Sequence, residues 1–236
     1  RFRYVYDTYL RNAGTKTYLS VIPDKNTFIA SQNGYPDKDY KALAERLRSG
    51  FPEAKYIDIS GLLSADDFYY TDSHWRQERI TKVADEIAAQ MGAERIGTCE
   101  IQDTGRPFYG VYYGQAALPH APERLFYLDN AVIRGLKVYN VETSSDIPVY
   151  DLDAAAGRDP YEMFLGGARS IIKITNPNAA KERRLIVFRD SFGSSIAPLL
   201  AAGYSEITLV DIRYISPLSL GKLIDFTKAD DVLFLY

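Results

Sequence analysis

The chain has 236 residues, which is enough for one domain, or for one domain with an insertion. Hydrophobic residues make up 46% and charged residues 25%, as is ordinary for a globular protein. A net charge of −3 without a dense Lys/Arg cluster argues against nucleic-acid binding, and no apolar run approaches the roughly 18–20 residues that span a bilayer.

The first part of the chain contains two strand patterns and two helix patterns. Residues 17–23 and 55–59 are short apolar runs of the kind found in strands. Residues 39–49 and 76–91 have apolar side chains at helical spacing, and Gly50 directly follows the first of these helices. In the second helix the apolar positions are Ile80, Val83, Ile87 and Met91.

The middle of the chain, residues 92–169, has a different pattern. Glycines, prolines and short β-like runs replace the alternation of strands and helices. We therefore expect one domain over residues 1–236, with residues 92–169 as an insertion of short antiparallel strands and loops.

The last third of the chain alternates strands with helices. Strands are expected at residues 184–188, 206–210 and 231–236, and helices at residues 194–202 and 216–228. Ser216 and Pro217 suit the N-cap and the first position of the second helix. Strands and helices at this spacing predict βαβ units, and hence an α/β fold built on a parallel sheet.

Cysteine use and the start of the chain give little information about location. Cys99 is the only cysteine, so neither an intrachain disulfide nor a thiolate metal cluster can form. The chain starts at Arg1 rather than at a methionine. We therefore expect a trimmed or processed form, and any signal peptide or membrane anchor would lie upstream of it.

A serine follows the strand at residues 184–188, within the sequence RDSFG of residues 189–193. Ser191 should lie at the C-terminal edge of a parallel sheet, where ligand sites of α/β proteins occur. The next helix points its N-terminus at this place, so the amides of Ser191 and Gly193 are candidate donors to an oxyanion. The alternative is that Ser191 only caps the helix.

A carboxylate and an imidazole lie two positions apart in the sequence DSHW of residues 72–75. Together with a serine, Asp72 and His74 complete the parts of a Ser-His-Asp triad, and Trp75 could wall the site or anchor the turn. One alternative is a helix start, with Asp72 as its cap. A metal site is a weaker alternative, because no second Asp-x-His element is present. The other histidine, His120, lies in a proline-rich loop where we expect it to be solvated.

In these two motifs the sequence resembles the DHHW family, a group of SGNH-hydrolase-like proteins related to the alginate O-acetyltransferases. The resembling segments are residues 70–75, 164–167, 187–193, 196–200, 204–214 and 230–234. The resemblance implies a three-layer α/β fold with Ser191 as nucleophile, His74 as general base and Asp72 as its orienting carboxylate. In ordinary SGNH hydrolases the Asp and His come late in the chain, so their early position here looks like a circular permutation.

The sequence departs from the family pattern at several positions. Ser73 stands where the family's name calls for a second histidine. Arg189 replaces the glycine of the usual Gly-Asp-Ser motif, so it would crowd the strand end or contact an anionic or sugar ligand. The glycine and asparagine that complete the usual oxyanion hole have no clear counterpart. The candidates for that role or for substrate contact are Gly166, Gly167, Arg213 and Tyr214. For Arg213 and Tyr214, the alternative is a role in packing and in a surface ion pair.

The leading hypothesis is an extracytoplasmic O-acyltransferase, an O-acetyltransferase in particular, that modifies a cell-surface or secreted polysaccharide through an acyl-enzyme. The resemblance further implies a membrane-bound O-acyltransferase as partner, and no cofactor is expected. A carbohydrate acetylesterase with the same triad is one alternative. The other is a polysaccharide-binding protein without catalysis, a hypothesis motivated by 19 tyrosines and by Arg189.

Overall fold

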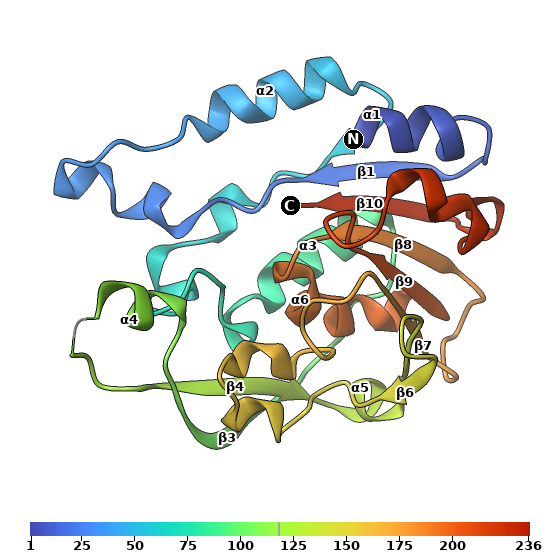
Figure 1. Ribbon diagram of the computed structural model, residues 1–236. Coiled ribbons are helices and arrows are strands. Elements are labelled where there is room, and N and C mark those ends of the chain that lie inside the picture. Colours follow the sequence, from blue (N-terminus) through green and yellow to red (C-terminus); the bar gives the residue numbers. More distant parts are fainter. Residues whose placement is uncertain (118) are drawn as a thin grey trace.

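The computed structural model describes residues 1–117 and 119–236, and these residues form a central eight-stranded sheet (Figure 1). In order across the sheet, the strands are β2 (Lys55–Tyr56), β1 (Lys16–Ser20), β10 (Asp231–Leu235), β8 (Arg184–Arg189), β9 (Glu206–Val210), β7 (Ile171–Thr175), β5 (Lys137–Asn140) and β6 (Ser145–Ile147). The first five run parallel, whereas β7, β5 and β6 each run antiparallel to the preceding neighbour. The strands predicted in the first and last parts of the chain are confirmed, although the one at residues 55–59 is short.

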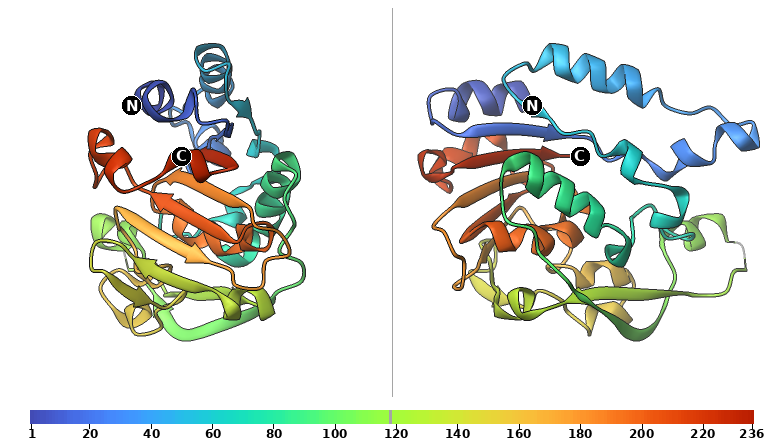
Figure 2. Two further views of the ribbon diagram at one scale, coloured as in Figure 1. Left: turned by 90° about the vertical axis from the view of Figure 1, so that its right-hand side faces the viewer. Right: turned by 180° about the vertical axis from the view of Figure 1, so that it is seen from behind.

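Alternating side chains of the central strands are buried on both faces of the sheet, which explains their continuous apolar runs. Leu185 and Val187 pack in one core cluster with helices α3 (Thr81–Met91) and α6 (Phe192–Leu200). Ile186 and Phe188 pack in a second cluster, on the opposite face. This cluster is covered by α1 (Phe2–Val5), the π-helical turn Tyr6–Leu10, α2 (Tyr40–Gly50) and two 3-10 turns near the C-terminus. The result is a three-layer α/β fold (Figure 2), as predicted.

Helix α3 differs from its prediction at the start. The four predicted apolar positions are buried, as expected. However, the α-helix begins at Thr81, and Gln77–Arg79 is a separate 3-10 turn. The side chain of Gln77 donates to the Ser195 carbonyl at 2.6 Å and accepts the Leu128 amide at 2.7 Å. These two bonds hold the segment between α6 and strand β4 (Glu123–Asp129), where a helical turn was expected.

The continuous helix predicted for residues 216–228 is wrong. The chain forms two 3-10 turns, Pro217–Lys222 and Phe226–Lys228. Ser216 does cap the first, but Asp225 has extended backbone angles and caps the second through the amide of Thr227. A carboxylate that bonds nearby amides stabilises a new turn at the expense of a continuing helix.

Residues 92–169 contribute to two structures. β3 (Glu100–Phe108) and β4 (Glu123–Asp129) form a separate antiparallel ribbon, flanked by the short helices α4 (Val111–Ala116) and α5 (Ala131–Gly135). Strands β5 and β6, in contrast, extend the main sheet. The strands are antiparallel as predicted; that the region is an insertion into a single domain stays a prediction. Among the helices of the described residues, none combines the length and apolarity needed to cross a membrane.

Candidate active site

Ser191 lies in the turn between β8 and α6, at the C-terminal edge of the parallel strands. Its side chain makes no capping hydrogen bond. Instead, Asp190 Oδ1 accepts the amide of Phe192 at 3.0 Å. The alternative that Ser191 merely caps this helix is therefore wrong, and its hydroxyl is left for another partner.

Asp72 and His74 lie in an irregular loop whose ends, Phe68 and Trp75, meet in an antiparallel bridge. Asp72 Oδ1 accepts the backbone amide of His74 at 2.9 Å, which closes a tight turn. The same oxygen lies 2.5 Å from His74 Nδ1. Because the following α-helix begins only at Thr81, Asp72 does not cap it, and the helix-start alternative is wrong.

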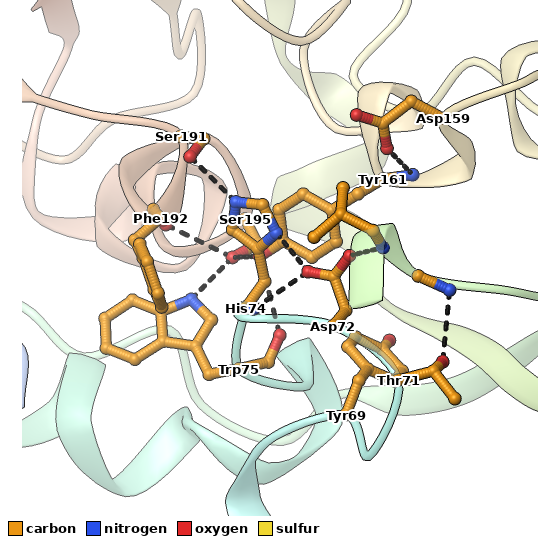
Figure 3. Close-up of polar contacts among 12 residues, drawn as sticks. Tyr69, Thr71, Asp72, His74, Trp75, Asp159, Tyr161, Ser191, Phe192 and Ser195 are labelled. Atoms are coloured by element: carbon orange, nitrogen blue, oxygen red, sulfur yellow. Dashed lines mark hydrogen bonds and ion pairs between the residues drawn. The ribbon is translucent and has the colours of Figure 1, made fainter. Parts of the chain in front are cut away.

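The hydroxyl of Ser191 and the imidazole of His74 meet across 117 positions of the sequence (Figure 3). His74 Nε2 lies 2.7 Å from Ser191 Oγ. The structure thus brings Ser191, His74 and Asp72 into one serine–histidine–aspartate network, hereafter the network. The side chain of Asp72 is 1% exposed and that of His74 is 12% exposed, so the imidazole is the part that solvent or a ligand can reach.

The environment of Asp72 favours its ionised form. Burial raises the pKa of this carboxyl, but the hydrogen bonds from His74 and from the amide of Val111 outweigh burial and lower the pKa below its ordinary value. Val111 donates to the second carboxylate oxygen, Oδ2, at 2.9 Å. Because an ionised carboxylate only accepts, His74 Nδ1 carries a proton; in the neutral imidazole, Nε2 then accepts the hydroxyl of Ser191.

Tyr161 supports the imidazole of His74, and Ser195 holds Tyr161 in place. The rings of Tyr161 and His74 stack with centroids 3.9 Å apart and planes 11° from parallel. The Tyr161 hydroxyl donates to Ser195 Oγ at 2.7 Å, and the Trp75 indole donates to the same oxygen at 2.8 Å. Ser195 in turn donates to the Phe192 carbonyl at 3.2 Å, which ties the histidine loop to helix α6.

Lys25 holds the backbone of the histidine loop. Its ammonium donates to the carbonyl oxygens of Tyr69, Tyr70 and Asp72 at 2.8, 3.0 and 2.6 Å. Burial lowers the pKa of Lys25, and the nearby carboxylates, Asp72 first among them, oppose that effect. One side chain from the N-terminal part of the chain therefore organises a loop almost fifty residues away.

Glu123 and Gly110 also hold the histidine loop. Glu123 accepts the amides of Tyr70 and Thr71 at 2.8 and 2.7 Å, and the Thr71 hydroxyl at 2.7 Å. The Gly110 amide donates to Thr71 Oγ1 at 3.0 Å. A Cβ atom at Gly110 would lie 2.4 Å from both Asp72 Cβ and the Thr71 carbonyl oxygen, so only glycine allows this approach.

Most of these supporting residues carry no signal in the sequence. Tyr161 is one of 19 tyrosines, and Lys25, Glu123 and Gly110 lie in segments without a recognisable motif. Ser195 is the exception: it follows Ser191 by four positions, and residues at that spacing share one face of a helix.

Comparison with known proteins identifies the family. The family model described as DHHW protein matches residues 62–210, more than half of the chain. The chain belongs to the DHHW family. The resemblance stated from the two motifs is thus confirmed.

Solved structures of similar fold support the architecture. PatB1 of Bacillus cereus, solved with a sulfonyl adduct, has a TM-score of 0.76 at 18% identity, and the matched region covers 99% of this chain and 86% of the PatB1 chain. A DHHW family protein from Eubacterium siraeum has a TM-score of 0.67 at 18% identity, and the matched region covers 94% of this chain and 77% of that protein. The O-acetyltransferase domain of Pseudomonas putida AlgJ has a TM-score of 0.54 at 14% identity, and the matched region covers 100% of this chain and 78% of the AlgJ domain. No curated protein matches the sequence. At these identities the likeness establishes the DHHW fold.

The expected oxyanion donor at Gly193 is not free. The Gly193 amide donates to the Asp190 carbonyl at 3.0 Å. Packing explains why position 193 is a glycine, since a Cβ there would lie 2.5 Å from Arg189 Cβ. Among the described residues, the amide of Ser191 has no hydrogen-bond partner.

The side chain of Arg189 is fully buried, in agreement with the alternative that it crowds the strand end, and its contact with a ligand stays a prediction. Nη1 donates to the Asp190 carbonyl at 3.2 Å and to Ser194 Oγ at 3.0 Å, which braces the serine turn from inside. Burial lowers the pKa of Arg189, and the nearby Asp211 carboxylate opposes this.

Gly166 and Gly167 form a turn with positive φ angles of 69° and 75°. The Gly167 amide donates to the Phe164 carbonyl at 3.1 Å, and a Cβ there would lie 2.8 Å from Glu162 Cγ. The positive φ angles and the close approach of Glu162 explain why glycines occupy these two positions. No hydrogen bond joins either of them to the network within the described residues, so their part in an oxyanion hole stays a prediction.

Arg213 and Tyr214 follow β9 and reach the same sheet edge as Ser191. Arg213 is exposed and pairs with the buried Asp211 at 2.6 Å, and Tyr214 is 56% exposed. This is the surface ion pair that the alternative reading predicted. Trp75 is fully buried, so it anchors the loop.

His120 is exposed, as predicted, and its ring stacks on Tyr70 with centroids 4.6 Å apart. In the part of the chain that the structure describes, no three His, Cys, Asp or Glu side chains gather into a possible metal site.

Proposed function

We propose that this protein is a serine-dependent O-acyltransferase, and in particular an O-acetyltransferase, that modifies a polysaccharide through an acyl-enzyme on Ser191. The observation that carries the proposal is the 2.7 Å contact between Ser191 Oγ and His74 Nε2, continued by the 2.5 Å contact between His74 Nδ1 and Asp72. Membership of the DHHW family and the fold likeness to the O-acetyltransferase domain of AlgJ support the same class of reaction.

In the first half-reaction, Ser191 Oγ attacks the carbonyl carbon of the acyl donor while His74 Nε2 takes the hydroxyl proton. The ionised Asp72 stabilises the resulting imidazolium, and the stacked ring of Tyr161 offers its electron-rich face to the same cation. The tetrahedral intermediate then expels the leaving group, which receives the proton from His74. We assign the unpartnered amide of Ser191 as one donor to the oxyanion.

In the second half-reaction, His74 removes the proton from a sugar hydroxyl, whose oxygen attacks the acyl carbon on Ser191. Collapse of the second tetrahedral intermediate breaks the ester bond to Ser191, and the proton returns from His74 to Ser191 Oγ. The acyl group thereby moves from enzyme to sugar without a cofactor.

Two further parts of the proposal concern location and partner. We propose that the protein acts outside the cytoplasm on a cell-surface or secreted polysaccharide, and that a membrane-bound O-acyltransferase supplies the acyl group. The support for both is the resemblance of the DHHW motifs to alginate O-acetyltransferases. Cell fractionation and co-purification with the tagged full-length protein test them.

The test of the nucleophile is intact-mass spectrometry after brief incubation with p-nitrophenyl acetate. We expect one acetyl group on the parent protein and none on Ser191→Ala. Ser73→Ala is the matched control, because this serine adjoins His74 but belongs to no hydrogen bond of the network; it should be acetylated like the parent. Acetylation of the Ser191→Ala protein at the parental rate would contradict the assignment.

The test of transfer adds an oligosaccharide to the acetylated enzyme. Acetylated sugar is the expected product. Free acetate alone would instead support the esterase alternative, in which water takes the place of the sugar hydroxyl. A protein that binds the oligosaccharide but never forms an acyl-enzyme would support the non-catalytic alternative.

A further inference from the structure

A cleft of about 810 Å³ lies beside the network and contains none of its three side chains. Residues 109–115, at and before helix α4, line one part of it, and residues 154–162, in two 3-10 turns, line another part. Neither segment was recognised as a site from the sequence.

Both walls of the cleft contact the network directly. On one side, the Val111 amide donates to Asp72 Oδ2 at 2.9 Å. On the other, the turn Pro160–Met163 carries Tyr161, whose ring stacks on His74. A ligand in the cleft would therefore lie beside the Asp72 end of the network rather than over Ser191, as expected of a part of a long substrate that does not react.

The lining of the cleft suits a carbohydrate. Tyr109 and Tyr113 both line it, with ring centroids 4.6 Å apart and planes tilted by 47°. Tyr109 is 39% exposed. A tyrosine ring offers a flat apolar surface with a hydrogen-bonding tip, which matches the apolar ring face and hydroxyl rim of a sugar.

The charges of the cleft restrict the kind of carbohydrate. Arg158 supplies one guanidinium, whereas Asp159 and Glu162 supply two carboxylates. One carboxylate of excess repels a polyanion such as a polyuronate chain. An uncharged sugar chain suffers no such repulsion and can use all three groups as hydrogen-bond partners.

We propose that this cleft is a distal subsite of the proposed O-acyltransferase, which binds a sugar unit of an uncharged acceptor chain beyond the sugar that is acylated. The inference rests on the proposed function, but its test measures binding and does not require turnover. Binding of the remote part of an acceptor here places a neighbouring hydroxyl at Ser191 and His74.

The test is calorimetric binding of oligomers of N-acetylglucosamine, from disaccharide to hexasaccharide, in the Ser191→Ala background, where no acyl transfer occurs. We expect affinity to increase with length, and the double variant Tyr109→Ala/Tyr113→Ala to lose that increase, with a Kd for the hexasaccharide about tenfold higher. Tyr35→Ala, which removes a 70% exposed tyrosine outside the cleft, is the matched control and should bind like the parent. An oligouronate of the same length should bind more weakly than the neutral hexasaccharide.

Equal hexasaccharide affinity in the double variant and the Tyr35→Ala control, with both proteins folded by circular dichroism, would overturn the subsite. Tighter binding of the oligouronate would overturn the assignment of an uncharged chain. Neither result touches the acetylation of Ser191, which the mass measurement reads separately, so the two proposals fail independently.

Discussion

The two halves of the network are built in opposite ways. Ser191 lies on a buried strand–turn–helix unit, and the contacts that shape its turn come from close neighbours such as Asp190 and Ser194. His74 lies in an irregular loop that depends on Lys25, Glu123 and residues near position 110, all distant in sequence. The serine side is thus determined by local structure, and the histidine side by long-range packing.

This difference predicts where the site is fragile. A change far along the chain should move the imidazole more readily than the serine hydroxyl, because the loop has few backbone hydrogen bonds of its own. The experiments below test the histidine side against matched positions, from the largest expected effect to the smallest.

Gly110→Ala should cause the largest loss. The new Cβ would lie 2.4 Å from Asp72 Cβ and from the backbone oxygen of Thr71, so the loop that carries the carboxylate must move. We expect the rate of Ser191 acetylation to fall by about a hundredfold or more, since misplacement of about 1 Å has that effect. Overpacking should also cost about 1–3 kcal/mol of unfolding free energy in urea.

Gly114→Ala is the control for this change, because it lies in helix α4, which Gly110 directly precedes, and a Cβ there meets nothing within 4 Å. It should acetylate like the parent. Full activity of Gly110→Ala would show that the loop adapts freely, and the contrast between the two sides would be lost.

Lys25→Met should come next. It removes three hydrogen bonds to the carbonyls of the loop and leaves these oxygens in a partly buried place. We expect a loss of about 2–3 kcal/mol in unfolding free energy, together with slower acetylation of Ser191. The exposed Lys41→Met serves as control, and equal stability of the two variants would refute this role of Lys25.

The same contrast explains how much of the fold the sequence revealed. Strands β8, β9 and β10 were found because buried parallel strands are short, continuous apolar runs. The helix expected at residues 216–228 does not form, because the carboxylate of Asp225 accepts a hydrogen bond from a nearby amide. Asp225 is also compatible with a helix surface. That choice depends on tertiary context, so local pattern could not reveal it.

For the site, the three side chains of the network could be predicted from the sequence, but the residues that hold them could not. Two histidines and one Asp-x-His motif left little choice for the base, and a serine after a strand indicated its partner. The supports of the loop come from residues whose types occur everywhere in the chain. For Arg189 the sequence left two roles open, and its complete burial agrees with crowding of the strand end, an unusual place for an arginine.

Tyr161→Phe separates the two contacts of this tyrosine. The phenyl ring keeps the stack on His74 but loses the hydroxyl that donates to Ser195. We expect a loss of about 1 kcal/mol in unfolding free energy, with acetylation slowed no more than about threefold. Tyr161→Leu, which also removes the stack, should be clearly slower in acetylation; equal rates in the two variants would mean that the stack is unimportant.

The smallest effect, and the one that compares both sides directly, is the pH dependence of stability. The pKa of Asp72, on the histidine side, lies below its ordinary value because the hydrogen bonds from His74 and Val111 outweigh burial. The pKa of Asp190, on the serine side, lies above its ordinary value because burial outweighs the bond from Phe192. Asp72 thus adds stability above its unfolded pKa, near 4, and this is lost as pH falls through the lower folded pKa. Asp190 behaves in the opposite way: its contribution is present below the unfolded pKa and is lost as pH rises through the raised folded pKa.

Urea unfolding of the parent, Asp72→Asn and Asp190→Asn between about pH 3 and about pH 7 checks both signs at once. As pH rises, the parent should gain stability relative to Asp72→Asn and lose stability relative to Asp190→Asn. Slopes of the same sign would mean that the two carboxylates share one kind of environment. Opposite slopes would mean that the turn bearing the serine carries an acid that burial keeps from ionising, while the loop bearing the histidine is built around an acid that must ionise.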